Sequence, residues 1–324
     1  MKNRLTISIA MTTYNGERFL KEQLDSFLWQ TRLPDELLVC DDGSTDGTVQ
    51  ILDSFKKQAP FPVKILINKQ NLGYGKNFEK ALSLCQGDII SFSDQDDIWL
   101  PEKLKEVEQV FQKNPAAGFI FHDALLVDEN GISRGFSLWD YYGFQFIKGS
   151  RLFPPGDFTP YCFKRIILGA TITLSDRLRD NLSPLPEGIP HDTWVAIAGS
   201  LIMPVVALPK RLNRYRQHAQ QVSGSPFYYK SKYKLARKMG RASFTESARR
   251  LKIILSRLLE DQRIKLNDDI VKQLHDRIEH IEIRGSLNSF ILKRLPVIIR
   301  EILKGRYHRH SSGWGSVARD LIGL

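Results

Sequence analysis

The chain has 324 residues, 42% of them hydrophobic and 26% charged, which is the composition of an ordinary globular protein with room for an α/β domain and a smaller helical region. Its net charge of +11 is uneven: residues 1–224 hold 25 Lys and Arg against 26 Asp and Glu, whereas residues 225–324 hold 22 against 10. The most apolar later stretch, 195–209, is interrupted by Gly199 and Pro204, so the sequence excludes a bilayer-spanning segment.

The N-terminal run Leu5–Met11 is a marginal apolar core for a signal peptide and no small-residue cleavage site follows it, so a buried first strand is expected. Cys40, Cys85 and Cys162 are odd in number, widely spaced and set among apolar residues. This usage is typical of a reducing compartment. We therefore expect a cytoplasmic protein, at the inner face of the cell membrane if the basic C-terminal region contacts lipid.

Through residue 120, short apolar runs alternate with helical patterns. The strand-like runs are Leu5–Met11, Glu36–Cys40, Val63–Ile67, Ile89–Phe92 and Gly118–His122. The helical patterns between them are Gly16–Gln30, Asp46–Gln58, Tyr74–Cys85 and Pro101–Asn114. This alternation predicts βαβ units and a mostly parallel sheet flanked by helices. Ligands of such sheets bind beyond the carboxyl ends of the strands, so the loops after the strands are the candidate site.

Residues 123–165 differ from the segment before them, because they are rich in aromatic residues, Gly and Pro and have weak periodicity. Two interpretations stand side by side: a structured excursion that forms half of a binding cleft, or a loop that hides its aromatic side chains in the core. The aromatic residues are Phe136, Trp139, Tyr141, Tyr142, Phe144, Phe146, Phe153 and Phe158.

From about residue 225 the pattern becomes helical. Ser243 and Glu246 have the spacing of a capping box, and a second helix is expected near Asn267. Phe290–Leu303 is apolar with interspersed Lys and Arg. Such basic amphipathic helices are typical of a membrane interface, but also of a helical cap or an oligomer interface. The predicted organisation is an α/β domain over 1–224 and a basic helical region over 225–324.

Two acidic clusters follow two of the predicted strands, at 41–47 and 93–97. The first is Asp-Asp-Gly-Ser-Thr-Asp-Gly and has the composition of an ordinary helix N-cap turn. The second is Ser-Asp-Gln-Asp-Asp. Three acids within four residues after an apolar strand suit a hard divalent cation with oxygen ligands. That cation would in turn hold a diphosphate.

Four motifs together resemble glycosyltransferase family 2: 10–16, Asp41–Ser44, Asn71–Gly73 and Ser93–Asp97. Each motif is weak alone, whereas all four in this order are specific. The resemblance covers roughly residues 5–224 and implies the GT-A fold with inversion at the anomeric carbon. Asp-Gln-Asp-Asp-Ile-Trp at 94–99, Pro101–Leu104 and Tyr215–His218 resemble the rhamnosyltransferase-like branch of that family.

The resemblance implies a nucleoside-diphosphate sugar as donor. Thr12 and Tyr14 would lie against the nucleoside, and Asp42 would accept a hydrogen bond from the imide N–H of uracil or thymine. Selection of a pyrimidine points to a dTDP- or UDP-sugar. Lys76 would offset the charge of the diphosphate, although a solvated helix lysine is the commoner role for such a residue.

The same resemblance assigns Asp94 and Asp96 to an Asp-x-Asp motif. Asp94 would touch ribose or metal, and Asp96 would bind Mg²⁺ or Mn²⁺ that bridges both phosphates. His218 is a candidate third ligand of the metal. Arg214 and Arg216 would reach the diphosphate and stabilise the leaving group.

Inversion also requires a base on the face of the sugar opposite the leaving group. The resemblance assigns this role to Asp192 in the segment His191–Trp194. A helix N-cap is the ordinary alternative for Asp192, and the two roles are compatible. Trp194 would form an apolar wall beside the base or belong to the core. His191 replaces the commoner acidic residue, and its role stays open. Gly169–Thr171 resembles the small-residue segment beneath the acceptor.

The sequence therefore predicts a metal-dependent glycosyltransferase. The first choice of donor is dTDP-rhamnose, and the expected acceptor is a glycan or lipid-linked saccharide of bacterial surface polysaccharide synthesis. An inactive sugar-nucleotide-binding relative is the alternative. Nucleic-acid binding by the tail is disfavoured, since 231–289 contains only Tyr233 and Phe244 as aromatic residues for base stacking. An oxidoreductase is disfavoured by the lack of Gly-x-Gly-x-x-Gly after a strand. A homo-oligomer stays open.

Overall fold

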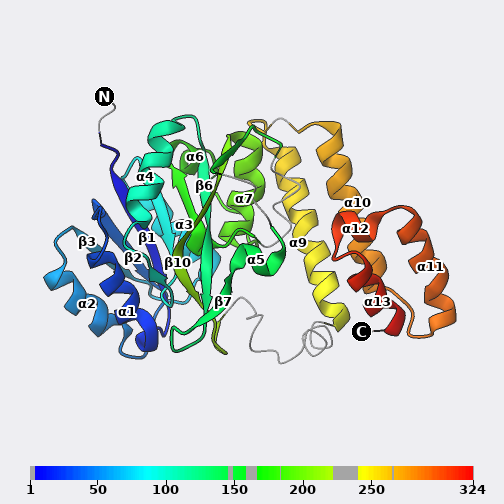
Figure 1. Ribbon diagram of the computed structural model, residues 1–324, viewed down its shortest axis with the longest axis horizontal. Helices are drawn as coiled ribbons and strands as arrows, with labels where there is room; N and C mark the ends of the chain where they lie inside the picture. The colour runs from blue at the N-terminus through cyan, green and yellow to red at the C-terminus, as the bar shows by residue number, and fades with distance from the viewer. Residues whose placement is uncertain are drawn as a thin grey trace. The chain divides into compact units, whose positions relative to one another are not determined.

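A computed structural model describes residues 4–144, 149–157, 166–182, 184–221, 240–264 and 266–323. The chain forms two compact units, residues 1–217 and 218–324 (Figure 1). The first unit ends one residue after its last strand, β10 (Val205–Arg216). The sequence places this boundary later, between residues 224 and 225.

The first four strands of the sheet are parallel neighbours in the order β3-β2-β1-β4. They are β1 (Ile7–Thr13), β2 (Glu36–Asp41), β3 (Val63–Ile67) and β4 (Ile89–Ser93). All four were expected within two residues of these bounds. The register sets Thr13 opposite Asp41 and Met11 opposite Ser93. The carboxyl ends of β1, β2 and β4 therefore meet at one edge of the sheet.

The other half of the sheet is mixed, in the order β4-β9-β6-β10-β5. Its strands are β9 (Ile172–Ser175), β6 (Phe119–Val127), β10 and β5 (Ile98–Trp99). Strand β9 runs antiparallel to both β4 and β6, and β5 runs antiparallel to β10. Strand β10 runs parallel to β6. The predicted α/β fold with a sheet flanked by helices is therefore confirmed, and the antiparallel β9 and the long β10 are strands that were not predicted.

Helices cover both faces of this sheet. One face carries α1 (Glu17–Leu28), α2 (Thr48–Gln58) and α4 (Lys103–Lys113), whose apolar stripes share a core with β1 and β2. Buried Leu and Phe side chains such as those of α1 each contribute about 1.5–3 kcal/mol. Helices α3 (Tyr74–Leu84) and α7 (His191–Ile202) pack together. The Phe78 ring of α3 lies 5.4 Å from the Phe92 ring of β4.

The segment after β6 forms β7 (Ser133–Ser137), α5 (Leu138–Tyr142) and β8 (Arg151–Phe153). Trp139 is 3% exposed, and its indole N–H donates to the carbonyl of Ile166 at 3.2 Å. For this aromatic residue the core interpretation is the right one. Phe146 and Phe158, named in the same prediction, lie outside the described residues, as does Cys162.

The second unit is helical, as expected. Its helices are α9 (Gly240–Glu260), α10 (Asp268–Gly285), α11 (Ile291–Leu303), α12 (Arg306–His310) and α13 (Trp314–Ile322). The Asn267 side chain caps α10 by accepting from the Ile270 N–H at 2.8 Å, as predicted. The predicted capping box is wrong, because α9 already begins at Gly240 and Ser243 lies inside it. In the described part of the chain, every helix is too short or too polar to cross a membrane.

Candidate active site

The loops after β1, β2 and β4 are tied together by side-chain hydrogen bonds. The Thr13 hydroxyl donates to Asp41 at 2.7 Å, joining the ends of β1 and β2. Between the loops after β1 and β4, the Tyr14 N–H donates to the Gln95 side chain at 2.8 Å, and the Gln95 amide donates back to the Tyr14 carbonyl at 3.0 Å. Buried Thr12 and half-exposed Tyr14 therefore lie on a braced edge of the sheet.

Asp42, the predicted contact to the base, is held by three donors. It accepts from the Asn68 amide at 2.8 Å, the Leu72 N–H at 2.8 Å and the Gly73 N–H at 2.9 Å. Gly73 adopts φ 78°, a conformation that favours glycine. An ionised carboxylate offers about four acceptor positions, so one stays open for an imide N–H. Asn68 and its partner Asn77 (2.8 Å) were not recognised from the sequence.

Asp94, Asp96 and Asp192 come together although they lie on separate elements. The pKa of Asp94 is raised to about 8, first by burial and then by the negative charges of Asp96 and Asp192. Charges act on a pKa in this way only at short range. The loop after β4 and the first turn of α7 therefore face one another. The His191 ring, next to Asp192, lies 5.0 Å from that of Phe92 on β4, which places the three acids in one neighbourhood; that they line one donor cleft stays a prediction.

Asp97, the fourth acid of this neighbourhood, has a structural position. It is fully buried and accepts from the Arg216 N–H at 3.0 Å and the Asn213 amide at 3.2 Å. Burial, then Asp96 and Asp94, raise its pKa. Asp97 therefore fastens the acidic loop to β10.

Lys103 supplies positive charge beneath the acids, and the sequence analysis gave it no role. It is fully buried at the start of α4, donates to the Ala170 carbonyl at 2.8 Å and lies 3.8 Å from the centre of the Trp99 ring. Burial lowers its pKa to about 7, while Asp97 and Asp94 act in the opposite direction. The signal for it in the sequence is its spacing of four residues from Val107, which puts a lysine on the buried stripe of α4.

The paired acids fit a divalent cation. Asp94 and Asp96 are oxygen ligands whose mutual repulsion a cation would relieve. Within the described ranges, no group of three or more His, Cys, Asp or Glu side chains is placed to hold a metal ion. Two carboxylates with diphosphate and water oxygens is nevertheless a common arrangement for Mg²⁺. His218 is the first residue of the second unit, and its role as a ligand stays a prediction.

The three predicted cationic contacts to the diphosphate lie in different settings. Arg214 is exposed on β10, and its role stays a prediction. The Lys76 ammonium pairs with Glu79 at 2.7 Å, which is the solvated-helix arrangement. Arg216 is 1% exposed, donates to the Asp96 carbonyl at 2.8 Å and pairs with Glu22. The guanidinium of Arg216 therefore orders the acidic loop, and its contact with the diphosphate stays a prediction.

Asp192, the predicted base, lies in the first turn of α7. The N-cap of this helix is Pro190, so the N-cap interpretation of Asp192 is wrong. One carboxylate oxygen, Oδ1, accepts from the Thr193 N–H at 2.6 Å, and the described residues offer Oδ2 no donor. Trp194 is 2% exposed and donates to the Leu182 carbonyl at 3.0 Å, which places it in the core.

His191, whose role was open, is a buried neutral imidazole. Its ring stacks on Phe78 at 3.8 Å and meets Phe92 edge-on at 5.0 Å. Burial lowers its pKa to about 4, with Asp192 acting in the opposite direction. A Cβ at Gly169 would lie 2.6 Å from the imidazole, so the glycine is required by tight packing. His191 thus sets the position of the turn that carries Asp192.

Comparison with known families identifies this unit. Residues 8–164 match the model of Glycosyl transferase family 2. This segment is a family 2 glycosyltransferase domain. The match includes the strands β1, β2 and β4 and both acidic clusters, and it confirms the family that the sequence motifs suggested.

Two curated relatives align with parts of the family 2 domain. An uncharacterized glycosyltransferase of Nostoc sp. is 32% identical over 126 residues, covering 39% of this chain and 38% of the relative. A dTDP-rhamnosyl transferase, RfbG, of Shigella flexneri is 43% identical over 100 residues, covering 29% of this chain and 34% of the relative. The aligned regions span only about a third of the length of these two proteins.

Solved structures confirm the GT-A fold. Staphylococcus aureus TarS in complex with UDP-GlcNAc superposes with a TM-score of 0.61 at 20% identity, over 89% of this chain and 76% of that one. The mannosyltransferase PcManGT of Pyrobaculum calidifontis, in complex with GDP-Man and Mn²⁺, gives 0.60 at 14% identity, over 99% and 86%. At these identities the likeness concerns the fold alone.

Proposed function

We propose that this glycosyltransferase inverts the anomeric centre of a dTDP- or UDP-sugar, with dTDP-rhamnose as the first choice, and transfers it to a glycan or lipid-linked saccharide. The observation that carries the proposal is the placement of three acids at the carboxyl end of β4. Asp94 and Asp96 directly follow this strand, and Asp192 follows His191, whose ring lies 5.0 Å from that of Phe92 on β4. Acids gathered in this way, with the pKa of Asp94 raised, are typical of a functional site.

The preference for a pyrimidine rests on Asp42. Its remaining acceptor position suits the imide N–H of uracil or thymine. Adenine has no such ring N–H, and guanine presents its N1–H beside an amino group that would need a second acceptor. Thr12 and Tyr14 would contact the nucleoside on the adjoining strand end. The 43% identity to a dTDP-rhamnosyl transferase supports thymidine and rhamnose, and the TarS complex with UDP-GlcNAc supports a uridine donor as the second choice.

In the proposed reaction, Asp192 takes the proton of an acceptor hydroxyl. The acceptor oxygen forms a bond to the anomeric carbon as the bond from that carbon to the diphosphate oxygen breaks on the opposite face. The products are the inverted glycoside and the nucleoside diphosphate. A Mg²⁺ or Mn²⁺ ion held by Asp94 and Asp96 would supply charge stabilisation to the leaving diphosphate. Arg216 holds the acidic loop through the Asp96 carbonyl, and Lys103, which donates to the Ala170 carbonyl, adds positive charge near Asp94.

A panel of donors tests this proposal. Thermal stabilisation and slow donor hydrolysis would be measured with dTDP-rhamnose, UDP-glucose, UDP-GlcNAc and GDP-mannose, each with Mn²⁺ and with EDTA. We expect the largest shift with a pyrimidine donor, dTDP-rhamnose first, and none with GDP-mannose. A preference for GDP-mannose would contradict the role of Asp42. An inactive sugar-nucleotide-binding relative would show stabilisation without hydrolysis or transfer.

A further inference from the structure

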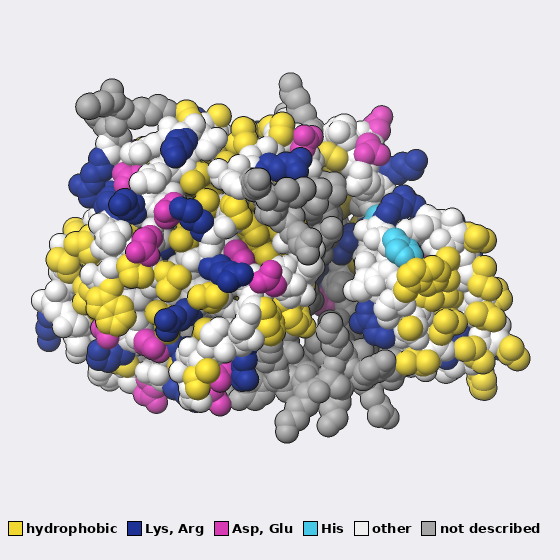
Figure 2. Space-filling view, viewed as in Figure 1, with side chains coloured by type: hydrophobic (Ala, Val, Ile, Leu, Met, Phe, Trp, Pro, Cys, Tyr) yellow, Lys and Arg dark blue, Asp and Glu magenta, His cyan; other side chains and the backbone are white. Residues whose placement is uncertain are grey.

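Helix α11 turns its apolar side away from its own unit. Leu292 is 81% exposed, Leu303 83% and Ile299 47%. At 100° per residue these side chains and Leu295 fall within one arc of the helix. An ordinary surface helix buries such a stripe, because each exposed Leu or Ile forfeits hydrophobic stabilisation. Figure 2 shows this apolar surface, in yellow, gathered over α11.

The side of α11 that is buried carries charges. Arg294 is 7% exposed and donates to the carbonyls of Ser289 and Leu321, both at 2.7 Å. Glu301 is fully buried and accepts from Arg306 at 3.3 Å. Its other oxygen lies 2.8 Å from His280 Nδ1. The inward face of α11 thus combines Arg294 and Glu301 with Ile298, which packs against Tyr307 and Val317, whereas the outward face is apolar.

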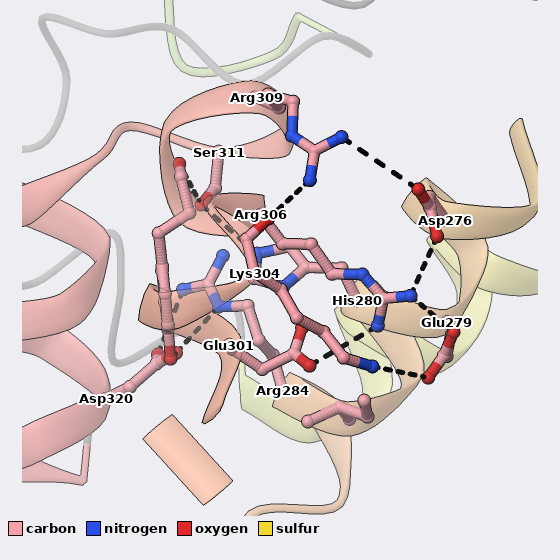
Figure 3. A network of polar contacts seen from close by, with 12 residues as sticks. Asp276, Glu279, His280, Arg284, Glu301, Lys304, Arg306, Arg309, Ser311 and Asp320 are labelled. Carbon is pink, nitrogen blue, oxygen red and sulfur yellow. Dashed lines mark hydrogen bonds and ion pairs between the residues drawn. The ribbon is translucent and has the colours of Figure 1, made fainter. Parts of the chain in front are cut away.

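A buried charge network fixes this orientation (Figure 3). The Arg306 guanidinium of α12 holds Asp276 at 2.7 Å and Glu279 at 2.6 Å on α10, and it also reaches Glu301 on α11. Rotation of α11 to bury its leucines would expose Glu301 and leave its partners buried without compensation. The apolar stripe is therefore a fixed feature of the surface of this unit.

The exposed charge beside the stripe is positive. Residues 285–324 contain seven Lys and Arg and two acids, Glu301 and Asp320. Both acids are buried, and Asp320 pairs with Arg284 at 2.7 Å. Three exposed basic residues lie along one flank of the apolar arc: Lys293, Arg300 and Lys304. Lys304 also forms a loose ion pair with half-exposed Glu279 of α10, at 3.9 Å.

Further large apolar side chains are exposed at the ends of the neighbouring elements. Phe290 before α11 is 71% exposed, Trp314 at the start of α13 is 65% and Ile322 at its end is 58%. Exposed Trp beside Lys and Arg is a composition found at membrane–water interfaces. The unit therefore offers an apolar stripe, basic flanks and an interfacial aromatic residue.

We propose that α11 docks this protein on an anionic phospholipid surface, with Leu292, Ile299 and Leu303 entering the acyl boundary and Lys293, Arg300 and Lys304 contacting headgroups. The occupant follows from charge: a lipid surface complements the basic flank, whereas a second copy of this chain would present the same positive charge to it. With 13 residues, α11 is about 20 Å long and lies on a bilayer instead of crossing it.

This inference goes beyond the proposed reaction and is tested by binding alone, so its failure and that of the donor assignment are separate results. The full chain would be sedimented with vesicles of phosphatidylglycerol and phosphatidylethanolamine, and with phosphatidylcholine vesicles. We expect binding to the anionic vesicles at least tenfold stronger than to the neutral ones, and weakened by 0.5 M salt because headgroup contacts are screened.

Two variants separate the contributions of apolar and basic residues. Leu292→Ser with Ile299→Ser removes apolar contacts, and Lys293→Gln with Arg300→Gln removes charge. Each should weaken vesicle binding about tenfold or more, since one basic residue near an anionic leaflet changes affinity about fivefold. Ile132→Ser, at a position 63% exposed in the first unit, is the matched apolar control and should bind as the wild type does. Variants that keep wild-type vesicle binding would overturn the proposal.

A measurement on the wild type covers the case in which a variant misfolds. Lipids brominated in the acyl chain should quench part of the tryptophan fluorescence, and Trp314→Phe should remove most of that quenching. Absence of quenching in the wild type would contradict insertion. A dimer that Leu292→Ser with Ile299→Ser dissociates, with no binding to either vesicle, would assign the surface to a second copy and overturn the lipid proposal.

Discussion

The two units differ in the signs of the charged side chains that lie together. In the first, Asp94, Asp96 and Asp192 bring like charges together, and the pKa of Asp94 rises as a result. In the second, Arg306 lies among Asp276, Glu279 and Glu301, so each charge has partners of opposite sign. A completed network stabilises one arrangement of helices. Neighbouring acids repel one another, and a cationic ligand would relieve that repulsion. The comparison distinguishes a structural cluster from a site.

The largest effect is expected for Asp192→Asn, which removes the proton acceptor and keeps its shape. Transfer should fall about 10³-fold, within the range for general-base catalysis, while donor affinity stays within about threefold of the wild type. Steady-state rates and donor titration would measure both. Asp53→Asn, on the exposed side of α2, is the matched control. Transfer by Asp192→Asn at a near wild-type rate would refute the assignment of the base.

In the second unit, Glu301→Gln should lower the free energy of unfolding by about 3 kcal/mol, because Arg306 would stay buried after losing a charged partner. Urea unfolding followed by circular dichroism would measure it. Glu260→Gln, on an exposed acid at the end of α9, should change stability by less than about 0.5 kcal/mol. A similar small loss for Glu301→Gln would show that the network is not what fixes α11.

His191 gives the first unit a dependence on pH. Its pKa is lowered to about 4 in the folded chain, whereas the unfolded chain takes up this proton below about pH 6.5. Stability from this group is therefore present above pH 6.5 and lost as the pH falls toward 4. Between pH 6.5 and 5 the loss is about 2 kcal/mol. Urea unfolding at several pH values should show a shallower decline for His191→Phe. If the wild type and His191→Phe lost stability equally as the pH falls, the assignment of this pH dependence to His191 would be contradicted.

The smallest effect on stability is expected for Asp94→Asn in the first unit, in contrast to Glu301→Gln in the second. Because the pKa of Asp94 is raised to about 8, its carboxyl is mostly neutral at pH 7 without metal, and Asp94→Asn replaces it with a neutral group of the same shape. The free energy of unfolding should therefore change by less than about 1 kcal/mol. Urea unfolding without added metal would measure it. Destabilisation as large as that of Glu301→Gln would mean that the acids of the site are compensated in the way of a structural network.

Much of the first unit follows from local sequence. Strands β1 to β4 and their helices are predictable because each is a short apolar run or one clear helical stripe. Strand β10 was missed since Pro209, Lys210 and Arg211 interrupt its apolar pattern, where register shifts break the pairing with β6. The antiparallel β9 depends on its neighbours in the sheet, which no local pattern reveals.

The positions of the acids were predictable because they directly follow strands or lie at the start of a helix, while their roles come from motif order and stay predictions. The residues that support them were not. Lys103 and Arg216 act through contacts with Ala170 and Asp96, far away in sequence. For α11 the sequence gives its basic and apolar composition, but only the fold shows that Arg294 and Glu301 point inward and the leucines outward.

The central claim is that the convergent acids hold a divalent ion against a pyrimidine diphosphate, and calorimetric titration of UDP and dTDP tests it most directly. Wild type should bind at least tenfold more tightly with Mn²⁺ than with EDTA, and Asp96→Ala should bind with the weaker affinity in both conditions. Equal affinity of the wild type with and without Mn²⁺, or an undiminished effect of Mn²⁺ in Asp96→Ala, would contradict the account.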